Sequence, residues 1–211
     1  IGKIDVIRAI ETSSNPYFSL LAGDVLHSPN DLAEAAKSFG FGSKTGINLN
    51  GEIAGKIPAD LETNRTGLYA MANGQHSLVV TPLQTCVMLA SIANSGKILK
   101  PNIVLKMAGT KFPTNHLENS EVLSKEWVIK SFPTSILRKI LLPPVIRNIL
   151  LEGMSKVVQR QLSEGLSALS RLYKNHPEAI GDYIELQDDI IGKTSTAEKV
   201  ETIDLDPYTG T

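Results

Sequence analysis

The stretch Ser13-Ser14-Asn15-Pro16-Tyr17-Phe18 (residues 13–18) separates two runs in which apolar residues recur at helical spacing. The first run, residues 3–11, predicts a helix because its isoleucines fall on one face. Asn15 followed by Pro16 predicts the start of a second helix, since asparagine is a favoured cap and proline at the first helical position costs no hydrogen bond. We therefore expect Ser13 and Asn15 to lie on a tight helix-to-helix loop.

The same reasoning predicts further helices along the chain. Thr81-Pro82 repeats the pattern of a cap followed by proline, and that helix closes near Gly96. Apolar periodicity predicts the other helices, and glycine-rich or polar sequence predicts the segments between them. The expected elements are helices over 31–39, 82–96, 144–159 and 162–172, loops and short strands over 42–60, an extended stretch over 97–101, and a polar surface segment over 109–125.

A second stretch, DDIIGKTSTAE (residues 188–198), ends a short apolar run on Gly192-Lys193-Thr194-Ser195. A phosphate-binding loop would need a glycine five positions before Gly192, where the chain has Gln187. The two aspartates that follow Gln187 would also repel a phosphate. The other interpretation is a β-strand that carries Lys193 into a site for serine acyl transfer.

Helices therefore dominate the chain up to about Tyr183, and the best strand pattern comes last. Runs of helices followed by strands are typical of segregated rather than alternating folds. The sequence predicts an α+β domain whose sheet is completed by late elements.

Composition excludes several classes of protein. With 211 residues, of which 42% are hydrophobic and 20% charged, the chain can bury a core. The formal net charge of −1 and the lack of a dense Lys/Arg block argue against nucleic acid and against an anionic membrane surface. Cys86 is the single cysteine and the four histidines stand far apart, so no metal-ligand spacing is present. No segment contains the roughly 20 apolar residues of a membrane span.

Acyl transfer by a serine needs a nucleophile, a base, donors for the oxyanion, and a cation for an anionic substrate. One known solution combines Ser-x-x-Lys, Ser-x-Asn and Lys-Thr-Gly motifs from distant parts of a chain. Ser13-Ser14-Asn15 supplies the second motif, and Lys193-Thr194-Ser195 an altered form of the third.

Several blocks of sequence occur in the order and spacing of one known family. They are residues 13–18, 39–47, 51–52, 55–58, 73–75, 80–84, 93–97, 101, 153–154 and 157–158. With these blocks the chain resembles the transpeptidase domain of class B penicillin-binding proteins, and most of all the cell-elongation type, penicillin-binding protein 2. The resemblance implies the fold shared with serine β-lactamases, an antiparallel sheet flanked by helices, present here as a partial domain over residues 1–211. It also implies that Lys44-Thr45-Gly46 belongs to a structural turn, so that Lys193-Thr194-Ser195-Thr196 is the site strand.

The resemblance implies roles for individual residues. Ser13 would relay the proton that the nucleophile loses, and Asn15 would hydrogen-bond the amide of the substrate or of a β-lactam. Lys193 would hold Ser13 in place and attract the substrate carboxylate, to which Thr194 and Thr196 would donate hydrogen bonds. The backbone near Thr196 would donate one bond to the oxyanion. Two plainer interpretations stay open: Asn15 as a helix cap, and Lys193 as an edge-strand lysine.

The sequence departs from the family pattern at three places. No serine has a lysine three residues later, so the nucleophile and its base are expected upstream of Ile1, and the final strands after Thr211. Ser195 stands where the family has glycine, beside Lys193 on the same face of the expected strand. The interval 159–190 is longer and more helical than the family leads us to expect, either as added scaffold or as an insert that docks a partner.

The resemblance implies a peptidoglycan D,D-transpeptidase of the bacterial cell wall. Its substrate would be a stem peptide ending in D-alanyl-D-alanine, and β-lactam antibiotics would acylate the same serine. No cofactor or metal is implied. The expected partner is a membrane-bound elongation glycosyltransferase, and the expected location is the periplasmic face of the inner membrane, with the anchor outside residues 1–211.

Two other functions remain open on the sequence alone. A non-catalytic scaffold of the elongation machinery could share the fold. A D,D-carboxypeptidase or a β-lactamase would use water in place of the acceptor amine, and no motif in the chain distinguishes the two acceptors.

Overall fold

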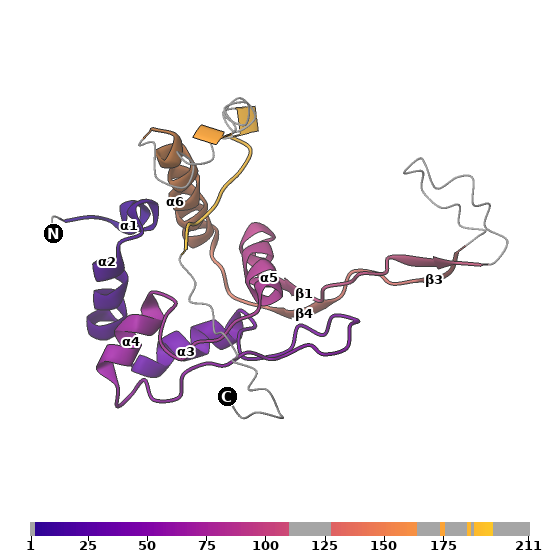
Figure 1. The fold of residues 1–211 in the computed structure, drawn as a ribbon, viewed down its shortest axis with the longest axis horizontal. Coiled ribbons are helices and arrows are strands. Elements are labelled where there is room, and N and C mark those ends of the chain that lie inside the picture. The colour runs from indigo at the N-terminus through magenta and orange to yellow at the C-terminus, as the bar shows by residue number, and fades with distance from the viewer. Residues whose placement is uncertain (1–2, 110–127, 164–173, 176–184, 187, 196–211) are drawn as a thin grey trace. The chain divides into compact units, whose positions relative to one another are not determined.

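The computed structural model describes residues 3–109, 128–163, 174–175, 185–186 and 188–195 (Figure 1). Its contacts divide the chain into two compact units. The first unit comprises Ile1–Pro29, Asp60–Ser77 and Asn148–Thr211, and the second comprises Asn30–Ala59 and Leu78–Arg147. Helix α6 (Pro144–Ser163) begins in the second unit and continues in the first, so it connects the two units in sequence.

The described part of the first unit is helical. Its elements are α1 (Val6–Thr12), α2 (Asn15–Leu20), the π-helical turn η1 (Leu21–Val25), α4 (Arg65–Ala72) and most of α6 (Pro144–Ser163). The helix predicted over 3–11 is confirmed as α1, but it begins three residues later. The reason is Asp5, which caps the helix by accepting a hydrogen bond from the Arg8 backbone N–H at 2.8 Å.

The junction of α1 and α2 is the tight loop that the sequence predicts. Ser13 ends α1 in the left-handed conformation, with φ of 54°, and its backbone N–H returns to the carbonyls of Ala9 and Ile10. The prediction that Asn15 caps α2 is wrong: Ser14 is the cap and Asn15 is the first helical residue. Proline tolerates either of the first two helical positions, so Pro16 alone did not fix the boundary. The side chain of Asn15 is thus not used as the cap.

The helix α4 was not predicted, although it carries a cap signal. Asn64 accepts a hydrogen bond from the Gly67 backbone N–H at 2.8 Å. The helix packs against α2 and η1, and a Cβ on Gly23 of η1 would overlap the ring of Tyr69. Glycine therefore allows the wide π-helical turn to approach α4 closely.

Asp60 links the two ends of α4. Its carboxylate accepts a hydrogen bond from Asn64 Nδ2 at 2.7 Å and one from His76 Nε2 at 2.9 Å. These two bonds, with that from His76 the larger, lower the pKa of Asp60 to about 2. Because His76 follows residues 73–75, the cluster also restrains the turn that those residues form.

The stabilisation by Asp60 should depend on pH. Its folded-state pKa lies below the ordinary value of 3.8, so the contribution is complete above that pH and is lost as the pH falls from 3.8 towards 2. Asp60→Asn should therefore lower the free energy of unfolding near pH 5, and this difference should shrink on acidification. Urea denaturation of both proteins from about pH 5 to about pH 3 measures it. A difference that stays constant with pH would contradict the assignment.

The core of the first unit joins α1 to α6. Ile10, Met154 and Val157 are buried together, and Val6, Phe18 and Leu150 pack against them. Gly153 of α6 packs closely against α1, since an added Cβ would lie 2.9 Å from Ile10 Cβ. The helix predicted over 144–159 is confirmed as α6 and extends to Ser163.

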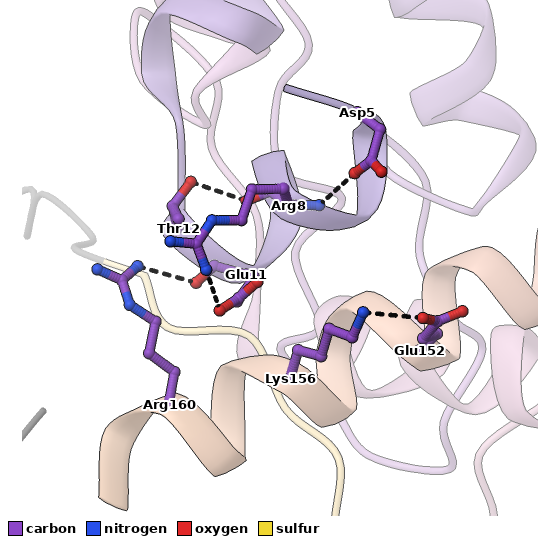
Figure 2. Close-up of polar contacts among 7 residues, drawn as sticks. All are labelled: Asp5, Arg8, Glu11, Thr12, Glu152, Lys156 and Arg160. Atoms are coloured by element: carbon purple, nitrogen blue, oxygen red, sulfur yellow. Dashed lines mark hydrogen bonds and ion pairs between the residues drawn. The ribbon is translucent and has the colours of Figure 1, made fainter. Parts of the chain in front are cut away.

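Figure 2 shows polar contacts of residues on and next to α1 and α6. On α1, Arg8 pairs with Glu11 and Thr12 bonds back to the Arg8 carbonyl at 2.8 Å. From α6, Arg160 Nη1 donates to the Glu11 carbonyl at 3.4 Å, one contact that joins the two helices directly. Surface pairs of this kind contribute little each. The close contact at Gly153 and the apolar core therefore set the distance between α1 and α6.

The described part of the second unit combines two helices with antiparallel strands. It holds α3 (Pro29–Ser38) and α5 (Pro82–Ala93), and the strands β1 (Lys97–Leu99), β2 (Lys106–Ala108), β3 (Val128–Ser131) and β4 (Ile136–Lys139). β1 pairs with β4 and β2 with β3, both antiparallel, so the two stretches of chain form one long ribbon, and α5 contacts β1 (Figure 1). The predicted α+β class is confirmed.

Gln84 holds the loops of the second unit against α5. Its side chain is 2% exposed and completes a capping box with Thr81. Its Nε2 donates to the carbonyls of Ser43 and Ala54, each at 2.8 Å. The predicted helix start at Thr81-Pro82 is confirmed, and the capping residue also fixes the glycine-rich segment.

The Lys44-Thr45-Gly46 stretch is held by hydrogen bonds to a side chain of the same unit. Glu52 accepts hydrogen bonds from the Thr45 backbone N–H and hydroxyl, both at 2.6 Å, and from the Gly46 N–H at 3.0 Å. Thr45 is buried, and the hydroxyl bond is the main reason why the pKa of Glu52 is lowered. Both backbone donors of this turn are therefore already occupied by a carboxylate.

The strand predicted around Lys193 is wrong for the described residues. Residues 190–195 form no ladder, and the backbone N–H of Gly192 donates instead to the Met154 carbonyl of α6 at 3.3 Å. A strand exists only where a neighbouring strand supplies the other half of each hydrogen bond, and the described part of the first unit has none. The inference that residues 193 and 195 share a strand face loses its basis.

Three predictions fall on residues outside the described ranges. These are most of the helix over 162–172, most of the polar segment over 109–125, and Thr196. None of the described helices combines the length and apolar character that a bilayer crossing requires.

Candidate active site

A cavity of about 480 Å³ lies within the first unit and gathers the predicted site residues. The α1–α2 junction contributes Ser13 and Asn15, and the segment along α6 contributes Lys193, Thr194 and Ser195. A volume of this size is within the usual range for small-molecule sites. Five of the six predicted residues therefore line one cavity, and the sixth, Thr196, is not described.

One hydrogen bond in the cavity joins two residues that lie 180 positions apart in the chain. Lys193 Nζ donates a hydrogen bond to Ser13 Oγ at 2.7 Å and another to its neighbour's carbonyl, Thr194 O, at 2.7 Å. Partial burial lowers the pKa of Lys193, because the charged form loses hydration. Since the hydroxyl of Ser13 accepts from the ammonium, its own proton is free to point into the cavity.

The packing of α1 on α6 explains how this pair forms. Ser13 is fixed at the end of α1 by its left-handed conformation, and Gly192 is tied to α6 through Met154. The position of Ser13 thus depends on α1 and that of Lys193 on α6, and Gly153 lets these two helices approach closely. The distance between Ser13 and Lys193 depends on that approach.

The electrostatics of the cavity favour an anionic ligand. Lys193 supplies a positive charge, and the described lining residues include no carboxylate. Hydroxyl groups of Ser13, Thr194 and Ser195 and the amide of Asn15 add neutral donors. Such a set can hold a carboxylate and hydrogen-bond an amide. Among the described residues, no group of three or more His, Cys, Asp or Glu could hold a metal ion.

The wall formed by the end of α4 carried no predicted role. Asn73 and Gln75 line the cavity beside Ala72, and Phe18 of α2 adds an aromatic surface. In the sequence, residues 73–75 stand out only as one block of the family resemblance. The available signal was the Asn64 cap, which would have placed α4 and hence the turn after it.

Comparisons with known proteins identify the family of the chain. Residues 1–204 match the family described as penicillin binding protein transpeptidase domain. The peptidoglycan D,D-transpeptidase MrdA of Salmonella typhimurium is 29% identical over 112 residues, which cover 49% of this chain and 18% of MrdA. The matched part of the chain therefore corresponds to less than a fifth of the length of this relative.

Solved structures share the fold. Penicillin-binding protein 2B from Streptococcus pneumoniae is 25% identical with a TM-score of 0.59, covering 82% of this chain and 29% of its own. The imipenem acyl-enzyme complex of penicillin-binding protein A from M. tuberculosis, at 19% identity and a TM-score of 0.60, covers 78% and 34% and shows the fold alone. The predicted penicillin-binding fold and the resemblance to class B members are confirmed. This chain belongs to the penicillin-binding protein transpeptidase domain family.

Proposed function

We propose that this chain forms part of a serine-type peptidoglycan D,D-transpeptidase that β-lactams acylate. The observation that carries the proposal is the hydrogen bond from Lys193 to Ser13 inside a cavity that also contains Asn15. Within the family, MrdA is named a peptidoglycan D,D-transpeptidase, and penicillin-binding protein A is described as an imipenem acyl-enzyme. Both names are consistent with a site built to bind an amide and an anion.

The proposed reaction has two steps. A serine hydroxyl adds to the carbonyl of the penultimate D-alanine, the peptide bond breaks, and the terminal D-alanine leaves with the proton. An amine of a second stem peptide then attacks the ester, forms the new amide and restores the serine. Because residues 1–211 contain no Ser-x-x-Lys, the nucleophile would come from a segment outside them.

The cavity residues would act on both steps. Ser13 would pass the proton between the nucleophile and the leaving amine, because its hydroxyl both accepts from Lys193 and donates. Lys193, with its lowered pKa, would assist that transfer and attract the substrate carboxylate. Asn15 would bind the substrate amide, while Thr194 and Thr196 would donate to the carboxylate.

We further propose the setting of the parent enzyme. It would act at the periplasmic face of the inner membrane, held by an anchor outside these residues, in the pathway that maintains cell shape. A membrane-bound elongation glycosyltransferase would supply the glycan strands whose stem peptides it joins.

The acceptor assay tests this function. The full-length gene product is incubated with a peptide ending in D-alanyl-D-alanine, with and without an amine acceptor, and products are resolved by mass spectrometry. Release of D-alanine with an amine-dependent cross-linked product is expected. Hydrolysed peptide alone would indicate a carboxypeptidase, and no D-alanine release would favour a non-catalytic scaffold.

Ser195 should restrict access to the cavity. It lines the site where the family has glycine, so its hydroxymethyl group takes up space near Lys193. We expect Ser195→Gly in the full-length protein to raise the second-order rate constant for acylation by benzylpenicillin by up to about tenfold, the scale for one small group in a binding pocket. Stopped-flow or competition kinetics measure it. An unchanged rate constant would show that Ser195 has no effect on β-lactams.

A further inference from the structure

Asn73 presents an unusual side chain in the wall of the cavity. It ends α4, and its Nδ2 donates to Ser19 Oγ and to the Tyr69 carbonyl, each at 2.9 Å. Both amide hydrogens are thus used. Since the Tyr69 carbonyl can only accept, the amide cannot be turned over, and its oxygen has a fixed position.

That oxygen, Asn73 Oδ1, is buried and has no hydrogen-bond partner among the described residues. Buried acceptors are rarely left unpaired in native proteins, and an exception calls for an explanation. The two hydrogen bonds that Nδ2 donates hold Oδ1 in place, although Oδ1 itself takes part in neither of them. A donor that arrives with a ligand would remove this penalty.

The other residues that line the cavity indicate which kind of ligand would bring a donor to Asn73 Oδ1. Lys193, Ser13 and Thr194 provide charge and hydroxyl donors, so they match the carboxylate and carbonyl oxygens of a ligand. Asn73 Oδ1 can only accept, so it matches an N–H group on the same ligand. An acylated amino acid or peptide carries both kinds of group.

We propose that Asn73 is a specificity-determining residue whose Oδ1 accepts a hydrogen bond from an amide N–H of the ligand in this cavity. The inference rests on the proposed function and adds a contact from α4 to it. Asn73 thereby selects ligands that carry an acylamino group over those that lack one.

Two β-lactams test the contact in the full-length protein. Benzylpenicillin carries an acylamino N–H, and sulbactam is a penam without that group. The second-order rate constant for acylation by each is measured by competition with a fluorescent penicillin. The quantity of interest is the ratio of the two constants, because a general loss of structure lowers both.

Variants of Asn73 and Ser19 separate the loss of the hydrogen-bond acceptor from a loss of the structure around it. Asn73→Leu removes the acceptor and should lower the ratio about tenfold. Ser19→Ala removes one of the two Nδ2 bonds but keeps the acceptor and its attachment to the Tyr69 carbonyl, so it should keep the wild-type ratio. Thermal unfolding verifies that each variant folds, and Asn73→Ala replaces the leucine variant if that one does not.

The outcomes are distinct from those for the proposed function. A wild-type protein that neither β-lactam acylates contradicts the proposed function itself. Acylation of the wild type, with equal losses for both β-lactams in Asn73→Leu, contradicts only the role of Asn73. A ratio that falls in Ser19→Ala as much as in Asn73→Leu would also overturn it, because the acceptor is kept there.

Discussion

Replacing Lys193 with alanine in the full-length gene product is expected to lower the rate constant for acylation by a fluorescent penicillin about 100-fold. The change removes the ammonium that donates to Ser13 Oγ at 2.7 Å, and with it the positive charge of the cavity. A preorganised charge in a partly dehydrated site stabilises the transition state more than it would in water. Time-resolved labelling with gel fluorescence measures the rate constant.

Lys156→Ala is the matched control. Lys156 lies on α6 in the same unit and pairs with Glu152 at 2.9 Å, away from the residues that line the cavity. Its replacement removes the same charge and should leave the rate of labelling within about twofold of the wild type. Equal rates for Lys193→Ala and the wild type would mean that the contact with Ser13 is structural only.

The second large effect is expected for Gly153→Ala. The added Cβ would lie 2.9 Å from Ile10 Cβ, well inside van der Waals contact, so α1 and α6 must separate. Overpacking of a core by one methyl group costs about 1–3 kcal/mol. Ser13 is attached to α1, and Lys193 is held against α6 through its neighbour Gly192. The same displacement should therefore separate Ser13 from Lys193 and slow acylation. Chemical denaturation and labelling of the full-length protein measure the two effects.

The control for this variant is Gln159→Ala, an exposed position on the same helix. It tests whether any substitution on α6 has these effects, and we expect no change in either measurement. If Gly153→Ala were as stable and as reactive as the wild type, the close approach of α1 and α6 would not position the pair.

Local sequence rules predicted those parts of the fold whose signals are local. Thr81-Pro82 gave the start of α5, because a cap with a proline and a glutamine three residues on satisfies its own backbone donors. The helix α4 was missed because Thr66 and Gly67 in its first turn are poor helix formers, and the Asn64 cap and packing against α2 and η1 compensate.

The site was predicted in part for a similar reason. Ser13 and Lys193 could be named because they stand in the Ser-x-Asn and altered Lys-Thr-Gly motifs of the family that the chain resembles, and the structure places them in contact. Asn73 could not be named, since its place in the cavity follows from how α4 packs. The strand around Lys193 was predicted wrongly because strand-forming residues in a sequence say nothing about whether a partner strand is present.

The most direct test of the account is covalent labelling of the wild-type full-length gene product with a fluorescent penicillin. The account predicts one labelled band that survives denaturation and is prevented by an unlabelled β-lactam. A protein that stays unlabelled under conditions that label a known member of the family would contradict the proposed enzyme, and the scaffold function would take its place.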